Sequence, residues 1–270
     1  VDYYSHIFYW GQAKGIDPLH DLWEDGRETY ANGRYLTELI TERAVGYIRE
    51  AAGAGQPFFL FVSYNAPHYP MHAPPAYLER FGDLPWPRRI MAAMLAAVDD
   101  GVGELLAECQ RHGVREDTCV VFLSDNGPSR ERRNWLDGTS APYYGGTAGR
   151  LKGHKFSLYE GGIRVPGIVN WPARLGGGQV CDVPVAGMDV FPALLAAAGG
   201  NPGDYELDGI DLGAVLAGAA SPPRDLFWEI GDQTAVRRGR WKLVRNGRLV
   251  EHERPPAALH LADLSADPGE

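Results

Sequence analysis

Two short polar stretches of this chain combine residue types that could bind and cleave an anionic ester. In Ser-Asp-Asn-Gly at residues 124–127, Asp125 and Asn126 offer a carboxylate and an amide carbonyl. These are hard oxygen donors of the kind that calcium and magnesium prefer. In residues 153–166, Lys155 lies in a glycine-rich loop and supplies a compact positive charge. Such an ammonium group suits the negative charge that accumulates on oxygen as an ester bond breaks.

A third polar stretch, Asn-Ala-Pro-His-Tyr-Pro at residues 65–70, contains His68. Its prolines restrict the backbone on both sides of the histidine and could fix the direction of the imidazole. A lone loop histidine is usually an ordinary surface residue, and an Asp-Asn-Gly turn is common without any metal. The three stretches together, in one chain, favour the functional interpretation of each.

The lysine loop also contains residues that would shape it rather than act on a substrate. Gly153, Gly161 and Gly162 permit tight backbone turns that could aim Lys155 inward. Glu160 and Arg164 are expected to form a buried pair that holds the loop together.

Two apolar runs end at these polar stretches. Residues 57–64 run into the histidine loop, and residues 118–124 end at the Asp-Asn pair. Short continuous apolar runs are typical of strands covered on both faces. Helical periodicity precedes each run, over residues 34–52 and 90–109. The alternation predicts an α/β fold with a doubly wound, mostly parallel sheet, in which ligands bind beyond the carboxyl ends of the strands.

The later part of the chain predicts a further strand over residues 165–171 and a helix with a glycine stop over residues 189–199. After the Pro-Pro pair at 222–223, short apolar runs alternate with glycine-containing turns, which predicts an antiparallel sheet. We therefore expect an α/β core over residues 1–220 and a small C-terminal subdomain over residues 221–270.

Composition and charge argue against several classes of protein. The 270 residues are 44% hydrophobic and 23% charged, as in ordinary globular proteins. A formal net charge of -9 argues against a nucleic-acid partner, which would require a basic face. No apolar run approaches the length of a membrane span. The three cysteines form no Cys-x-x-Cys pair and are expected to be small core residues.

Taken together, the three polar stretches resemble those of the type I sulfatases of the alkaline phosphatase superfamily, and the resemblance runs through nearly the whole chain. It implies an alkaline phosphatase-like α/β fold and a sulfuric ester hydrolase that acts on aryl sulfates or sulfated saccharides. The expected partner is thus a small-molecule or saccharide sulfate ester. A periplasmic or secreted location is implied in the same way.

The resemblance also assigns roles to residues. Asp125 and Asn126 would bind Ca²⁺, with Mg²⁺ as an alternative. Lys155 and His68 would act on the sulfuryl group or on the leaving oxygen. Weaker candidates for contact with the substrate are Tyr69, His72, Trp135 and His154. The interpretation requires that the carboxylate, amide, imidazole and ammonium groups face a common cavity.

The nucleophile of such an enzyme is not found in this sequence. Sulfatases use a formylglycine made from the Cys or Ser that opens a Cys/Ser-x-Pro-Ser/Ala-x-Gly pattern, and neither the three cysteines nor Ser221 begins that pattern. The aspartate pair that completes the family's metal site is also missing. We therefore expect a sulfatase truncated at the N-terminus, where the formylglycine would lie, and at the C-terminus. The chain alone is expected to be inactive and poorly soluble.

Two other interpretations stay open at this point. The same metal and cations suit a phosphoryl group, so a phosphonate or phosphate ester hydrolase of the same superfamily is an alternative. The chain could also be a non-catalytic fragment that binds sulfated glycans or no ligand.

Overall fold

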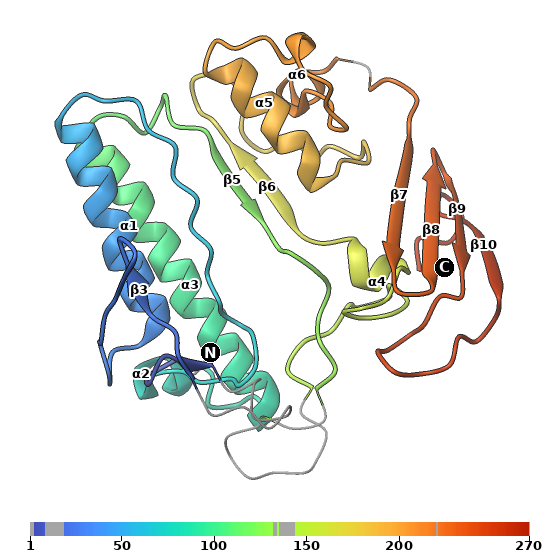
Figure 1. Cartoon of the computed structure of the whole chain (residues 1–270), viewed down its shortest axis with the longest axis horizontal. Helices are drawn as coiled ribbons and strands as arrows, with labels where there is room; N and C mark the ends of the chain where they lie inside the picture. Colours follow the sequence, from blue (N-terminus) through green and yellow to red (C-terminus); the bar gives the residue numbers. More distant parts are fainter. Residues whose placement is uncertain (1–2, 9–18, 132–133, 135–143, 220, 270) are drawn as a thin grey trace. The chain divides into compact units, whose positions relative to one another are not determined.

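The protein is described by a computed structural model (Figure 1). It covers residues 3–8, 19–131, 134, 144–219 and 221–269. Contacts divide the chain into two compact units, Val1–Arg115 with Ser129–Thr147 and Glu116–Pro128 with Ala148–Glu270. The C-terminal strands thus belong to the same unit as the Asp125 and Lys155 loops. The expected domains 1–220 and 221–270 stay a prediction.

The first unit is built around two long helices, α1 (Leu36–Gly53) and α3 (Trp86–Arg111), which lie side by side (Figure 1). Both were predicted from their apolar periodicity, because residues three to four apart share one face of a helix. The short helix α2 (Pro75–Glu79) precedes α3 and begins with proline, whose fixed φ suits a first helical position.

The core of this unit joins both helices to the histidine loop. Its buried members include Tyr3, Tyr35, Met71 and Met94. Two small antiparallel pairs lie in the same unit. They are β1 (Ile7–Phe8) with β2 (Leu19–His20), and β3 (Trp23–Glu24) with β4 (Arg27–Glu28).

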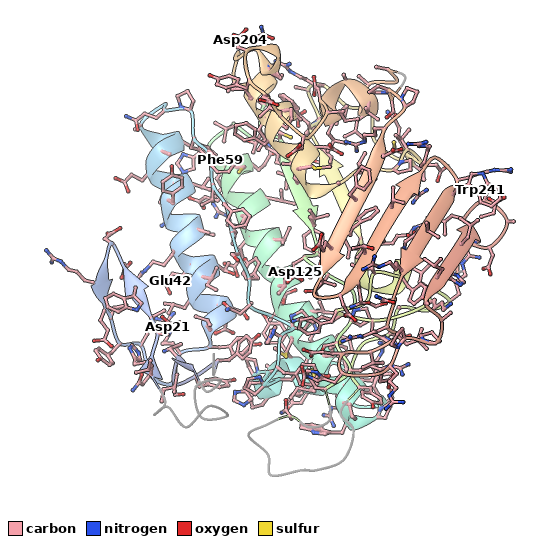
Figure 2. The ribbon with its side chains drawn as sticks, turned by 45° about the vertical axis from the view of Figure 1, so that its right-hand side comes forward. Asp21, Glu42, Phe59, Asp125, Asp204 and Trp241 are labelled. Carbon is pink, nitrogen blue, oxygen red and sulfur yellow. The ribbon has the colours of Figure 1, made fainter. Side chains whose placement is uncertain are left out.

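Residues 57–64, predicted as a strand covered on both faces, form no strand with any described segment. One face packs on α1, where the Phe58 ring meets Tyr47 edge-on at 6.2 Å between centroids. Phe59, labelled in Figure 2, and Phe61 alternate with it. They are 69% and 78% exposed. The predicted burial on both faces is therefore wrong here, because helices cover one face and no described strand covers the other.

In the second unit, β5 (Val120–Leu123) pairs with β6 (Gly167–Asn170) (Figure 1). Both strands were predicted, but their pairing is antiparallel, with Val120 opposite Asn170. A parallel pair requires a crossover, usually a helix, that carries the chain back along the sheet. Between these two strands the described helix is α4 (Glu160–Ile163), of only 4 residues. Every strand pair of the described residues is antiparallel, so the expected parallel sheet is not confirmed.

Short helices follow β6 in the second unit. They are η2 (Gly187–Asp189), α5 (Val190–Ala197), η3 (Pro202–Asp204) and α6 (Leu212–Leu216). The helix predicted at residues 189–199 corresponds to α5. Its start is fixed by Asp189, a fully buried carboxylate that accepts hydrogen bonds from Arg224 and from two backbone amides.

The chain ends in the predicted antiparallel sheet. Its strands are β7 (Asp225–Ile230), β8 (Gln233–Arg238), β9 (Trp241–Arg245) and β10 (Leu259–Asp263), in the order β10-β9-β8-β7 (Figure 1). The β8–β9 turn contains Gly239 at φ +58°, which favours glycine. One face of β8 and β9 packs on residues of the lysine loop.

The cysteines differ in burial. Cys109 is buried in α3 as expected, whereas Cys181 is exposed, so a core role for all three is wrong. Cys119 lies between these extremes, and burial raises the pKa of its thiol. No helix in the described part of the chain is long and apolar enough to span a bilayer.

Candidate functional site

The Asp-Asn pair follows the end of β5, and Asp125 is exposed there (Figure 2). Its Oδ1 accepts a hydrogen bond from the Asn126 backbone amide at 2.8 Å. The Asn126 side chain donates through Nδ2 to the Gly127 carbonyl at 2.9 Å. The amide nitrogen of Asn126 is thus used within the turn. The Asp125 carboxylate and the Asn126 amide oxygen are the hard donors that the turn offers.

The lysine loop is bonded directly to this turn. The Gly127 amide donates to the Gly162 carbonyl at 2.9 Å, and the Lys155 amide donates to the Pro128 carbonyl at 2.9 Å. A Cβ atom on Gly127 would lie 1.9 Å from the Gly161 carbonyl oxygen, well inside van der Waals contact. The two stretches that the sequence predicted as one site are thus packed backbone to backbone.

Lys155 is half-buried, and its Nζ lies 5.6 Å from the centroid of the Phe156 ring. Phe156 itself has a φ of +69°, a conformation that is uncommon for a residue with a side chain. Gln233 of β8 donates from Nε2 to the Phe156 carbonyl at 2.9 Å. The backbone next to the lysine is therefore held in an unusual conformation by a residue of the C-terminal sheet.

Glu160 is a buried carboxylate within the lysine loop. Arg164 approaches it at 3.9 Å, so the two expected partners do meet, but the Arg164 side chain is 53% exposed. The principal partner is Lys242 of β9, whose Nζ donates to Glu160 Oε1 at 2.9 Å and whose side chain is 0% exposed. Arg237 of β8 adds a third cation at 3.7 Å.

Sequence reasoning did not identify Lys242. In the run Trp-Lys-Leu-Val-Arg at β9, Trp241 and Leu243 look like the inward-facing residues, yet the structure buries Lys242 and Val244 instead. The available signal was the position of a lysine within an apolar run, two residues from a valine on the same face.

His68 lies in the first unit and is exposed. Its Nδ1 is 2.6 Å from the Tyr69 carbonyl oxygen. A carbonyl oxygen only accepts, so Nδ1 carries the hydrogen in this contact and Nε2 is left for another partner. The His68 carbonyl accepts from the Tyr3 hydroxyl at 3.2 Å, and the His68 amide donates to the Asn65 carbonyl at 2.8 Å.

The neighbouring Tyr69 and His72 pack inward. Tyr69 is 5% exposed, and its hydroxyl accepts from the Gly145 amide at 3.4 Å. Burial raises the pKa of that hydroxyl. The His72 ring is half-buried beside Tyr3 and Tyr4, at 6.2 and 5.9 Å between centroids. Substrate contact by either residue stays a prediction, and the burial of Tyr69 counts against it.

Asn134 is a second residue that sequence reasoning missed. It is 4% exposed, accepts from the Met71 amide at 2.5 Å and donates to the Met71 carbonyl at 3.0 Å. This two-point bond fixes the chain just after the histidine loop. Its sequence signal is slight, because a single Asn in a long loop is unremarkable.

The remaining candidates are His154 and Trp135. His154 is half-buried next to Lys155, and its carbonyl accepts from the Ser157 amide at 2.9 Å. Trp135 lies outside the described residues.

The donor set around the Asp-Asn turn fits part of a cation site. Calcium takes about 6–8 oxygen ligands and magnesium about six. Asp125 and Asn126 supply hard oxygens of the right type. No group of three or more His, Cys, Asp and Glu residues able to hold a metal occurs within the described ranges. The turn therefore suits a shared site to which other segments would contribute ligands.

Comparison with known proteins points to one family. The sulfatase family model matches residues 7–200. Mouse arylsulfatase J is 30% identical over 284 residues, covering 96% of this chain and 45% of the relative. Dog N-acetylgalactosamine-6-sulfatase is 32% identical over 214 residues, covering 77% and 38%. The crystal structure of Ps i-CgsB in complex with k-i-k-neocarrahexaose aligns with a TM-score of 0.77 and 27% identity, over 96% of this chain and 56% of that one.

The chain belongs to the sulfatase family. It spans under half the length of the curated relatives it matches, with shares of 45% and 38% for the two named above.

Proposed function

We propose that the protein containing this chain hydrolyses sulfate esters of saccharides or aryl alcohols. The observation that carries the proposal is the direct bonding of the Asp-Asn turn to the lysine loop through Gly127–Gly162 and Lys155–Pro128. This arrangement fixes hard oxygen donors and an ammonium-bearing segment in one compact unit. A tetrahedral anion suits such a combination.

Lys155 is proposed to bind a sulfuryl oxygen through Nζ. The ester oxygen and the sulfuryl oxygens gain negative charge as the S–O bond breaks, so this contact strengthens in the transition state. Phe156, whose ring lies beside Nζ, limits the access of water to one side of it.

Asp125 and Asn126 are proposed to provide two ligands of a Ca²⁺ site, with Mg²⁺ as the alternative. When bound, such an ion polarises the sulfate and adds positive charge near its oxygens. The remaining ligands, and the formylglycine nucleophile expected by family resemblance, would come from outside this chain.

His68 is proposed to act at Nε2 as a hydrogen-bond partner of the leaving oxygen. The contact from Nδ1 to the Tyr69 carbonyl keeps a proton on Nδ1 and orients the ring. A proton bound at Nε2 could then pass to the departing alkoxide, which yields the free alcohol. This role is carried over from the sequence motif.

A saccharide or aryl substrate is favoured by the relatives. One is an N-acetylgalactosamine-6-sulfatase, another is an arylsulfatase, and the aligned structure contains a neocarrahexaose. A periplasmic or secreted location stays a prediction.

The test is turnover by the protein as expressed from its own gene, with an aryl sulfate, a sulfated saccharide and a phosphonate monoester. Lys155→Ala is expected to lower kcat for the sulfate esters by about 100-fold or more. The matched control is Lys152→Ala, which removes a lysine of the same loop whose Nζ lies over the Tyr159 ring at 4.3 Å. We expect it to stay within about threefold of the parent.

Unchanged turnover in Lys155→Ala would show that this lysine does not act on the ester. Preferred cleavage of the phosphonate would instead move the proposal to the alternative phosphoryl chemistry.

A further inference from the structure

The inner face of the C-terminal sheet contacts the lysine loop over residues 156–160. Apolar residues of β8 and β9, Ala235 and Val244, pack on Leu158 and Tyr159 of the loop. Polar contacts flank this apolar patch on both sides. One lies at Phe156, the residue after Lys155, and the other lies at Glu160.

The contact at Glu160 is an ion pair withdrawn from water. Glu160 and Lys242 are 2% and 0% exposed, and their charged atoms are 2.9 Å apart. Removing two charges from water is costly, and the attraction between them often fails to offset that cost. An apolar pair of similar volume would serve packing at least as well. A buried pair of this kind is better suited to fixing one arrangement than to adding stability.

The contact at Phe156 is made by a buried amide. Gln233 is 4% exposed, and its Nε2 donates to the Phe156 carbonyl. Its Oε1 accepts from the Arg248 amide at 2.8 Å, so both ends of the side chain are used. A two-ended bond leaves Gln233 no freedom to rotate. It therefore holds the Phe156 carbonyl in the direction that its φ of +69° requires.

We propose that Lys242 and Gln233 are positioning residues for Lys155, and that the inner face of β8 and β9 is the template on which the lysine loop takes its active conformation. The proposal rests on the proposed role of Lys155. Neither residue touches the ester in this account. They act through the backbone of residues 156–160, which sets where the Lys155 ammonium lies.

The rival explanation is that Lys242 only prevents an unpaired buried charge at Glu160. A double variant separates the two. Lys242→Met alone leaves Glu160 without its principal partner, so it lowers stability under either explanation. Lys242→Met with Glu160→Gln removes both charges and should restore the melting temperature. Under the proposal, the neutral pair no longer fixes the loop, although the fold is intact.

The first measurement is hydrogen–deuterium exchange of the loop amides. In the double variant, exchange of the Lys155, Gly161 and Gly162 amides is expected to rise at least about tenfold, because their hydrogen bonds open more often. Exchange in α1, which belongs to the first unit, should stay unchanged.

The second measurement is the division of the kinetic effect between kcat and KM. Displacement of Lys155 from the developing charge should lower kcat by about tenfold or more and change KM less. Lys242→Arg keeps a cation and is expected to recover part of kcat.

The matched control is Arg238→Met, on the same sheet. It breaks an ion pair with Asp225 in which the Arg238 side chain is 81% exposed. Such a pair contributes little, so exchange and turnover should both equal those of the parent. Should a Lys242 variant fail to fold, Gln233→Leu tests the same template, with faster exchange at residues 155–162 and a lower kcat expected.

The proposal is overturned if the double variant regains the parent melting temperature together with parent exchange and parent kcat. Failure of the proposed function looks different, because the parent itself would then cleave no sulfate ester. The exchange measurement would still report whether the C-terminal sheet fixes the loop.

Discussion

The two loops that carry the candidate catalytic side chains are held in different ways. The histidine loop of the first unit is fixed by neutral hydrogen bonds, from Tyr3 to His68 and from Asn134 to Met71. The lysine loop of the second unit is fixed by a buried ion pair and by backbone contacts that leave no room for a side chain. The first arrangement depends on single side chains, whereas the second depends on close packing of the main chain.

Each unit contains a buried glutamate, and the two glutamates connect different kinds of element. Glu108 in α3 is 2% exposed and is bonded to Arg49 of α1 at 2.9 Å and to Arg111. Charge in the first unit therefore joins two helices. In the second unit, Glu160 joins the C-terminal sheet to the lysine loop. The buried Glu108 thus supports the scaffold of the first unit, whereas the buried Glu160 supports the candidate site of the second.

The largest loss of stability is expected when one methyl group is added to the lysine loop. A Cβ on Gly161 would lie 2.2 Å from the Gly153 carbonyl oxygen and 2.6 Å from that of Lys152. Backbone atoms cannot move aside singly, so Gly161→Ala should lower the free energy of unfolding by about 3 kcal/mol. Thermal or denaturant unfolding of purified protein measures the loss.

The control for that change is Gly103→Ala in α3, where nothing lies within 4 Å of the added atom. Alanine favours a helix over glycine, so this variant should gain about 0.5–1 kcal/mol. Equal behaviour of the two variants would contradict the tight packing described for the loop.

A smaller loss of stability is expected next to the histidine loop, where the Asn134 side chain holds the backbone of Met71. Asn134→Ala leaves the amide and carbonyl of Met71, a fully buried residue, without these bonds. The loss should be about 2 kcal/mol in the free energy of unfolding. Tyr69→Phe is the comparison within the loop. It removes a 3.4 Å contact to Gly145 and should cost well under about 1 kcal/mol. A larger cost for Tyr69→Phe than for Asn134→Ala would show that the Tyr69 hydroxyl restrains this segment more than Asn134 does.

The last variant is Glu108→Gln, which should be less stable than the parent at neutral pH and should approach the parent in acid. Hydrogen bonds from Arg111 and Arg49 lower the pKa of Glu108 from 4.5 to about 2. A carboxyl whose pKa is lower in the folded state stabilises that state above its unfolded pKa, and the stabilisation is lost as pH falls. The parent melting temperature should therefore fall more steeply than that of Glu108→Gln between pH 4.5 and about 2. Glu104→Gln, at an exposed position of α3, should follow the parent curve. Parallel curves for the parent and Glu108→Gln would contradict the ion cluster.

Much of the local structure could be predicted from the sequence. The helices α1 and α3 follow from apolar periodicity, and the C-terminal sheet follows from short runs between glycine turns. The motifs predicted a shared site for the Asp-Asn turn and the lysine loop, and two backbone bonds join these stretches. These features depend on neighbouring residues or on strong motifs.

The features that could not be predicted depend on partners far along the chain. In β9 a shift of one position decides whether Trp241 or Lys242 is buried, and the Glu160 carboxylate that Lys242 contacts explains the choice. The exposure of Phe61 likewise depends on which segment covers it, and an apolar run contains no such information.

During protein synthesis the lysine loop is made before the C-terminal strands that contact it. Gln233 follows Phe156 by 77 residues, and Lys242 follows Glu160 by 82. At about 5–20 residues per second, a ribosome needs roughly 4–16 s to make that stretch. Throughout this interval the nascent loop lacks the strands that shape it. Its anion-binding geometry would thus mature late, after the helices of the first unit have already emerged.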